Sequence, residues 1–244
     1  QLTNQAINSQ GGKILTSQGD LTVTGSVNSQ GSDSVIQSAN DLTVNGGTIT
    51  NGNGAMLSAA KALTVNADAL NNDKALIVAN QAVSINAGST TNSGSIASVN
   101  DAVTIAGGSV NNNAGEIAAK QALTINAGNA NLTNQTGQLL GHTTSVTAAV
   151  VDNSNHGLVL ANQDLTVNAG TISNSDTKQA PDAILSQGLV AGGDATLTAA
   201  VIDNSKGQMV AGNAATLNVS QTLNNANGRI ESTHVQVNGN SNGN

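Results

Sequence analysis

The residues of this chain that could do chemistry are few, and they do not gather at a recognisable spacing. The three histidines, His142, His156 and His234, occupy unlike positions, with no set of His, Cys and Asp residues at the spacing of a metal site. The chain has no cysteine, which excludes disulfides, thiolate metal sites and thiol catalysis. We therefore predict no catalytic residue, no metal site and no cofactor, and we expect that the protein is not an enzyme.

The charged residues are also sparse and scattered. They make up 9% of the 244 residues, and the formal net charge is −7. Nucleic-acid binding needs a clustered positive face, and single-strand binding adds aromatic platforms. The seven basic residues are spread along the chain and there is no Phe, Tyr or Trp. We therefore expect no nucleic acid among the partners.

One short sequence motif, called the phrase below, recurs about every 20 residues. It predicts the strands on which any functional residue would lie. Each copy has two apolar residues two apart with a polar residue between them, which is the pattern of a half-buried strand. Such a fixed period indicates a solenoid. The copies begin at Leu2, Leu21, Leu42, Leu63, Val83, Val103, Leu123, Val146, Leu165, Leu197, Leu217 and Val235.

Two further apolar segments follow each phrase, for example Leu70 and Ile77 after Leu63. Three short strands and three turns in about 20 residues form one coil of a parallel β-helix. We expect right-handed winding, as parallel crossovers nearly always show. The predicted fold is therefore an all-β, right-handed parallel β-helix of about 11 coils. Leu21 and Val23 should face inward, and Thr22 should face outward.

Two irregularities interrupt this period. The coil from Leu123 is 23 residues long, with extra residues near 129–131 or 141–142. The coil from Leu165 is 32 residues long, and its excess is most simply placed at 177–188. Insertions in a solenoid become loops, and loops often carry binding. The candidate ligand-binding residues are Lys178, Pro181 and Asp182, which would make this segment a glycan- or receptor-binding module.

Two recurrent columns have a structural interpretation. An asparagine follows the second apolar segment of most coils, as at Asn51, Asn72 and Asn112, and often precedes a glycine. We expect asparagines to stack amide on amide, and glycines to adopt positive φ in tight turns. An outward threonine column resembles one rank of an ice-binding surface. A second threonine rank would support ice binding, and a cluster of acidic and basic residues on one sheet would support a polysaccharide lyase.

The chain has no apolar run long enough to span a bilayer, so we expect no membrane span. It also lacks a signal peptide, and both ends carry ordinary repeats without a polar cap. We therefore expect residues 1–244 to form a single β-helical repeat segment that is a fragment of a longer rod.

The repeats resemble those of the filamentous haemagglutinin family. The resemblance rests on units such as 63–67 with 70–72, and 103–105 with 108–115. It implies a secreted exoprotein of the Gram-negative cell surface, exported by an outer-membrane two-partner secretion transporter. The family includes adhesins, haemolysins and effectors of contact-dependent growth inhibition. The resemblance therefore implies a structural rod that supports cell adhesion, and its partner would be a host or bacterial cell-surface receptor or glycan.

Overall fold

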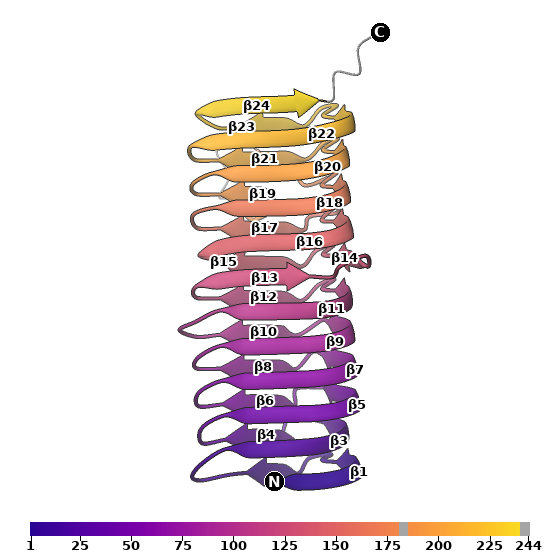
Figure 1. Cartoon of the computed structure of the whole chain (residues 1–244), viewed down its shortest axis with the longest axis vertical. Coiled ribbons are helices and arrows are strands. Elements are labelled where there is room, and N and C mark those ends of the chain that lie inside the picture. The colour runs from indigo at the N-terminus through magenta and orange to yellow at the C-terminus, as the bar shows by residue number, and fades with distance from the viewer. Residues whose placement is uncertain (181–184, 240–244) are drawn as a thin grey trace.

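The protein is a β-solenoid, described here by a computed structural model that covers residues 1–180 and 185–239. Strands stack in parallel along one axis and wind right-handed from the N-terminal to the C-terminal end (Figure 1). The described residues contain strands and turns and no helix. The predicted fold class is therefore confirmed.

The strands form two parallel sheets, and nearly every coil contributes one strand to each. The first sheet runs β1-β3-β5-β7-β9-β11-β13-β16-β18-β20-β22-β24, and β14 pairs with β11 and β16 beside this path. Its strands are β1 (Leu2–Asn8), β3 (Leu21–Gln30), β5 (Leu42–Gly52), β7 (Leu63–Asp73), β9 (Val83–Asn92), β11 (Val103–Asn111), β13 (Ala122–Asn126), β14 (Asn131–Thr133), β16 (Thr143–Asp152), β18 (Leu165–Ser173), β20 (Ala195–Asp203), β22 (Ala214–Asn224) and β24 (His234–Gly239).

The second sheet holds the shorter strands that close each coil. Its order follows the sequence from β2 to β23. Its strands are β2 (Lys13–Leu15), β4 (Val35–Ser38), β6 (Met56–Ala59), β8 (Leu76–Ala79), β10 (Ser95–Ser98), β12 (Glu116–Ala119), β15 (Gln138–Gly141), β17 (Leu158–Ala161), β19 (Gly188–Ala191), β21 (Gln208–Ala211) and β23 (Arg229–Glu231).

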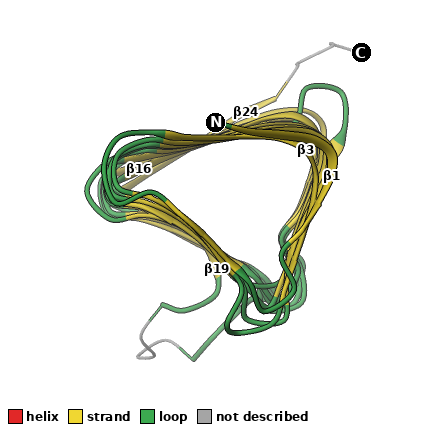
Figure 2. Ribbon diagram, turned by 90° about the horizontal axis from the view of Figure 1, so that it is seen from below, coloured by secondary structure: helices red, strands yellow, loops and turns green. Residues whose placement is uncertain are grey.

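The cross-section is triangular, but most coils have two strands and not the predicted three (Figure 2). The first two apolar segments belong to one long strand that bends at a corner. Small residues such as Gly46 and Ala67 occupy this bend and keep their parallel pairing through it. Only the coil from Leu123 has two separate strands there, β13 and β14, because residues 127–130 loop out between them.

The register corrects several of the predicted repeat starts. Leu123 pairs with Thr144 and not with Val146, so this coil is close to the standard length. The coil from Leu165 closes at Ala195 and not at Leu197. The sequence pattern was misleading because Thr144 and Ala195 replace the first large apolar residue of the phrase. In the same way, Leu2 pairs with Val23, and Leu217 pairs with Val237.

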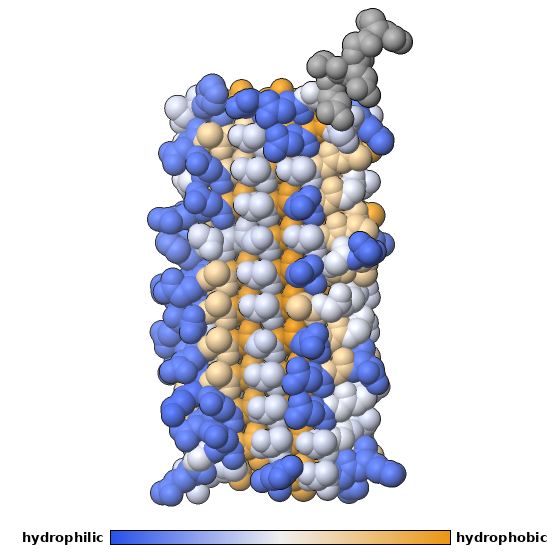
Figure 3. All heavy atoms as spheres, viewed as in Figure 1, coloured by the Kyte–Doolittle hydropathy of each residue, from blue (hydrophilic) through white to orange (hydrophobic). Residues whose placement is uncertain are grey.

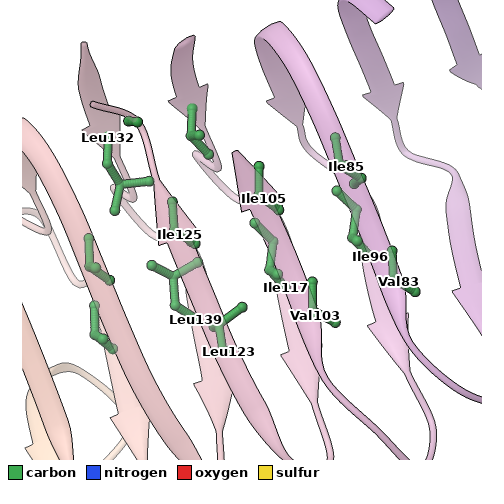
Figure 4. Packing of buried hydrophobic residues seen from close by; sticks show 14 of the residues in the cluster. Val83, Ile85, Ile96, Val103, Ile105, Ile117, Leu123, Ile125, Leu132 and Leu139 are labelled. Atoms are coloured by element: carbon green, nitrogen blue, oxygen red, sulfur yellow. The ribbon is translucent and has the colours of Figure 1, made fainter. Parts of the chain in front are cut away.

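The core is a stack of aliphatic layers. Leu63 and Val65 point inward from the first sheet and are fully buried, as the alternation predicts, and Thr64 between them is partly exposed. Ile96 and Ile117 on the second sheet pack against inward residues of the first, such as Val83 and Ile105 (Figure 4). Because each layer is covered by the layers above and below it, the coils stabilise one another and a single coil cannot fold alone.

Candidate functional site

A buried asparagine ladder runs along the corner that follows the long strand. From Asn51 to Asn204, the Nδ2 of each asparagine donates to the Oδ1 of its counterpart in the next coil, over 2.7 to 2.9 Å. Each of these Nδ2 atoms also donates to at least one backbone carbonyl of the same corner, as from Asn112 to the oxygens of Gly115 and Gln138. The members are Asn51, Asn72, Asn92, Asn112, Asn134, Asn153, Asn174, Asn204 and Asn225.

This arrangement confirms the amide ladder and gives the column a structural role. Eight of its nine members are at most 1% exposed, so their side chains cannot contact a ligand from solvent. The ladder begins at Asn51, whose Oδ1 is buried without a hydrogen-bond partner. Ser29 holds the equivalent position in the preceding coil, and its hydroxyl bonds to that of Ser34.

The glycines of this corner serve a different purpose from the one predicted. Gly54 has the expected positive φ, but Gly94, Gly115, Gly137, Gly157, Gly207 and Gly228 do not. In most of these coils the residue before the glycine is left-handed, as at Ala114 with φ 58°. A Cβ at Gly115 would lie 2.6 Å from Asn92 Nδ2 and 2.7 Å from Asn112 Oδ1. The glycine is needed because Asn112 of its own coil and Asn92 of the preceding coil leave no space for a side chain.

Ranks of outward residues run along the first sheet, one of intermediate hydropathy and another with many hydrophilic residues (Figure 3). The first rank is threonine or serine from Thr22 to Thr216, in continuous register. The second rank contains Thr24, Thr147 and Thr198, but asparagine occupies it in most other coils, as at Asn66. A doubly threonine-ranked face is not formed.

The largest departure from the repeat is the insertion between β18 and β19. Fourteen residues, 174–187, separate these strands, whereas four, 204–207, separate β20 from β21. The excess lies in the predicted segment 177–188, and Figure 2 shows the described ends of this segment projecting from the corner below β19. Lys178 is exposed at its start. Pro181 and Asp182 lie outside the described residues.

Gln208, a buried residue of the next coil, holds both limbs of the insertion. Its Nε2 donates to Gln187 O over 2.8 Å and to Gln179 Oε1 over 3.1 Å, and its Oε1 accepts from the amide of Gln179. Its own backbone amide donates to the hydroxyl of Thr177, over 3.1 Å. The sequence does not single out Gln208. Nothing in the surrounding repeat indicates that its side chain contacts a loop that lies about 30 residues earlier in the chain.

An open groove of about 760 Å³ lies beside the start of the insertion. Its floor is formed by four successive turns, at Asn155–His156, Asp176, Lys206 and Asn227. Residues 178–180 form its wall. The Nζ of Lys178 donates to Asn227 O over 2.8 Å, and Lys206 Nζ lies 3.8 Å from Asp176 Oδ1.

The three histidines lie apart in the structure, as the sequence suggests. His156 Nδ1 is 2.7 Å from Gln187 Oε1, at the returning limb of the insertion. His142 lies between β15 and β16, and His234 begins β24. Within residues 1–180 and 185–239 no three His, Cys, Asp or Glu side chains gather in a way that could hold a metal ion.

Comparison with protein families identifies these coils. The model described as haemagglutinin repeat matches five overlapping segments, 1–53, 33–108, 82–150, 129–188 and 182–243, which together span nearly the whole chain.

The chain belongs to the haemagglutinin-repeat family.

The haemagglutinin-repeat segment 129–188 includes the insertion, and it overlaps the following segment at 182–188. Neither the curated proteins nor the solved structures gave a match. In the part of the chain that is described, no helix has the length and apolar character needed to cross a membrane. The resemblance seen in the sequence is therefore confirmed at the level of the family.

Proposed function

We propose that this chain is a structural rod segment of a secreted, filamentous haemagglutinin-type adhesin at the Gram-negative cell surface. The observation that carries this proposal is the uninterrupted parallel stack of strands from β1 to β24, in a chain whose repeats match this family throughout. A stack of this kind extends by adding coils, so it can hold other parts of an exoprotein away from the cell. The rod itself carries out no catalysis in this proposal.

Export through an outer-membrane two-partner secretion transporter is part of the same proposal. It is supported by the family and by a chain that has neither cysteines nor aromatic residues. No disulfide can form before such a chain is threaded through a transporter. A parent protein that delivers a toxin or acts as a haemolysin would use the same rod, with that activity carried by another part of it.

Surface labelling of the source bacterium tests the rod proposal. An antibody raised against residues 1–244 should label intact cells and detect the protein in the culture medium. Inactivation of the partner transporter should remove both signals while the antigen remains inside the cell. Labelling that requires permeabilised cells would refute the proposal.

A second candidate function, direct binding of a cell-surface glycan or receptor, is favoured by the insertion. Gln208 is 0% exposed and makes four hydrogen bonds to the insertion limbs and Thr177. A loop that had lengthened only by neutral insertions would not need a buried side chain to hold both of its ends. We propose that the insertion and the groove beside it form an adhesive contact, with Lys178 as the exposed contact residue among those described.

Ice binding and polysaccharide cleavage receive no comparable support. The second outward rank is mostly asparagine, and the described residues that line the groove include Asp176, Lys178 and Lys206 and no second acidic residue. We do not propose either activity.

A further inference from the structure

We infer that the groove beside the insertion binds the carboxylate of an acidic sugar, with Lys178 and Lys206 as the contacts that select it. This inference rests on the proposed adhesive contact and names the class of ligand that the contact takes. The shared chemistry is a sugar carboxylate, which is found in sialic acid at the end of a glycan and in uronic acid along a polysaccharide.

The charge of the groove is opposite to that of the chain. The protein has a formal net charge of −7, but the described residues that line the groove include two lysines and one aspartate, which gives this set a net positive charge. Asp176 does not neutralise this charge fully, because its Oδ1 is 3.8 Å from Lys206 Nζ and both side chains are more than half exposed. An anionic ligand is therefore attracted to this groove from an otherwise acidic surface.

Both ammonium groups keep donors for a ligand. A lysine has three N–H donors, and Lys178 uses one of them on Asn227 O. Lys206 Nζ is beyond hydrogen-bond distance from Asp176, the one carboxylate near it among the described residues, so it can donate to a ligand carboxylate. The two residues lie side by side, because the amide of Lys178 donates to Lys206 O over 2.9 Å. A carboxylate between them would receive charge-assisted hydrogen bonds from both.

The rest of the groove suits a sugar better than a peptide or a membrane. Among the described residues that line it, Asn155, Gln179 and Asn227 place amide groups along the groove, and Ala180 is the only apolar residue. Amides can both donate to and accept from hydroxyl groups. The four stacked turns extend over about 14 Å at the strand spacing, which is long enough for a short oligosaccharide.

The turns are held rigidly, so the groove is formed before any ligand arrives. Asn155, Asp176 and Lys206 are each left-handed, and each donates its amide to the next coil, to Ser175, Ser205 and Ala226 respectively. The insertion limb that forms the wall is fixed by Gln208. A preformed groove loses less entropy on binding, which makes recognition of a small sugar feasible.

Binding of the whole chain to immobilised glycans tests this inference. The probes are a sialyl-lactose conjugate, a polyglucuronate and, as the uncharged control, the lactose conjugate. We expect one of the two acidic probes to bind, and which of them binds identifies the source of the carboxylate. The double variant Lys178→Gln, Lys206→Gln should bind that probe at least about tenfold more weakly, which corresponds to one lost charged contact. The matched variant Lys61→Gln, Lys120→Gln should bind it as the wild type does.

The result also separates this inference from the proposed adhesive contact. Equal binding of acidic and uncharged probes, no binding of either acidic probe, or an unchanged double variant would overturn the inference. If cells still adhere through the insertion in any of these cases, the adhesive contact stands and takes a ligand of another class. If removal of the insertion leaves cell adhesion unchanged, the adhesive contact itself is refuted.

Discussion

Asn92 and Asn112 are joined by a buried hydrogen bond, in which the Nδ2 of Asn92 donates to the Oδ1 of Asn112 over 2.7 Å. The two residues are 20 positions apart in the sequence and occupy the same corner of successive coils. This bond links one coil to the next from inside the corner, in addition to the pairing of the strands. Its repetition along the rod explains why an asparagine recurs there in coil after coil.

Removal of one member of the ladder should destabilise the rod. In Asn112→Ala the three donor contacts of Nδ2 are lost, and the Nδ2 of Asn92 loses one of its three acceptors in a buried site. We expect a loss of about 3 kcal/mol in the free energy of unfolding, measured by urea denaturation. Asn66→Ala is the control, because Asn66 makes the same kind of bond to Asn45 at the surface. Equal losses in the two variants would show that burial does not determine the role of the ladder.

Adjacent residues of the same corner should respond in opposite directions. Ala114 is left-handed with φ 58°, so Ala114→Gly should stabilise the rod, by up to about 1 kcal/mol. Gly115→Ala should destabilise it by more, because the new Cβ would collide with Asn92 and Asn112. Thermal denaturation of both variants measures the effects. A destabilising Ala114→Gly together with a neutral Gly115→Ala would contradict this assignment.

The inward and outward faces should differ sharply in their tolerance of charge. Val65 is fully buried between Val44 and Ile85, so Val65→Asp places an unpaired carboxylate in the core. We expect a loss of at least about 3 kcal/mol or failure to fold, as judged by circular dichroism and denaturation. Thr64→Asp, one residue earlier and on the outer face, should cost about 0.5 kcal/mol. Similar effects at the two positions would mean that the faces are assigned wrongly.

Gln208 should control how tightly the insertion is held. In Gln208→Ala the side-chain bonds to Gln179 and Gln187 are lost, so the limb that carries Lys178 should open more often. We expect trypsin to cleave after Lys178 about tenfold faster than in the wild type, since about 1.4 kcal/mol of local stability gives this factor. Gln138→Ala is the control, because Gln138 begins β15 in the same sheet and lies far from the insertion in sequence. An unchanged rate of cleavage would show that Gln208 does not anchor the loop.

The sequence predicts the fold well because its determinants are local. The alternation around Leu63, Thr64 and Val65 specifies an inward and an outward face, and its repetition leaves a β-solenoid as the simplest arrangement. The register was harder to predict, since Thr144 and Ala195 stand where most coils have a large apolar residue. The pairing of whole strands decides the register, and one substituted position does not change it.

The candidate site could be predicted only in part. The length of the coil from Leu165 places an insertion at 177–188, and Lys178 is an obvious exposed residue within it. The contribution of Lys206 and the anchoring role of Gln208 depend on contacts between residues about 30 positions apart. Such contacts follow from the stacking of coils around an irregular turn, which a repeat pattern does not describe.

Adhesion of cells to the purified chain, with and without residues 178–187, tests the account most directly. The deletion joins Thr177 to Gly188 and leaves four residues, 174–177, between β18 and β19, as 204–207 lie between β20 and β21, so the rod should still fold. Circular dichroism and an unchanged melting temperature would verify this. We predict that cells bind the wild-type chain and bind the deletion variant at least about tenfold more weakly. Equal binding by the two folded proteins would contradict the claim that the rod carries a local adhesive contact at the insertion.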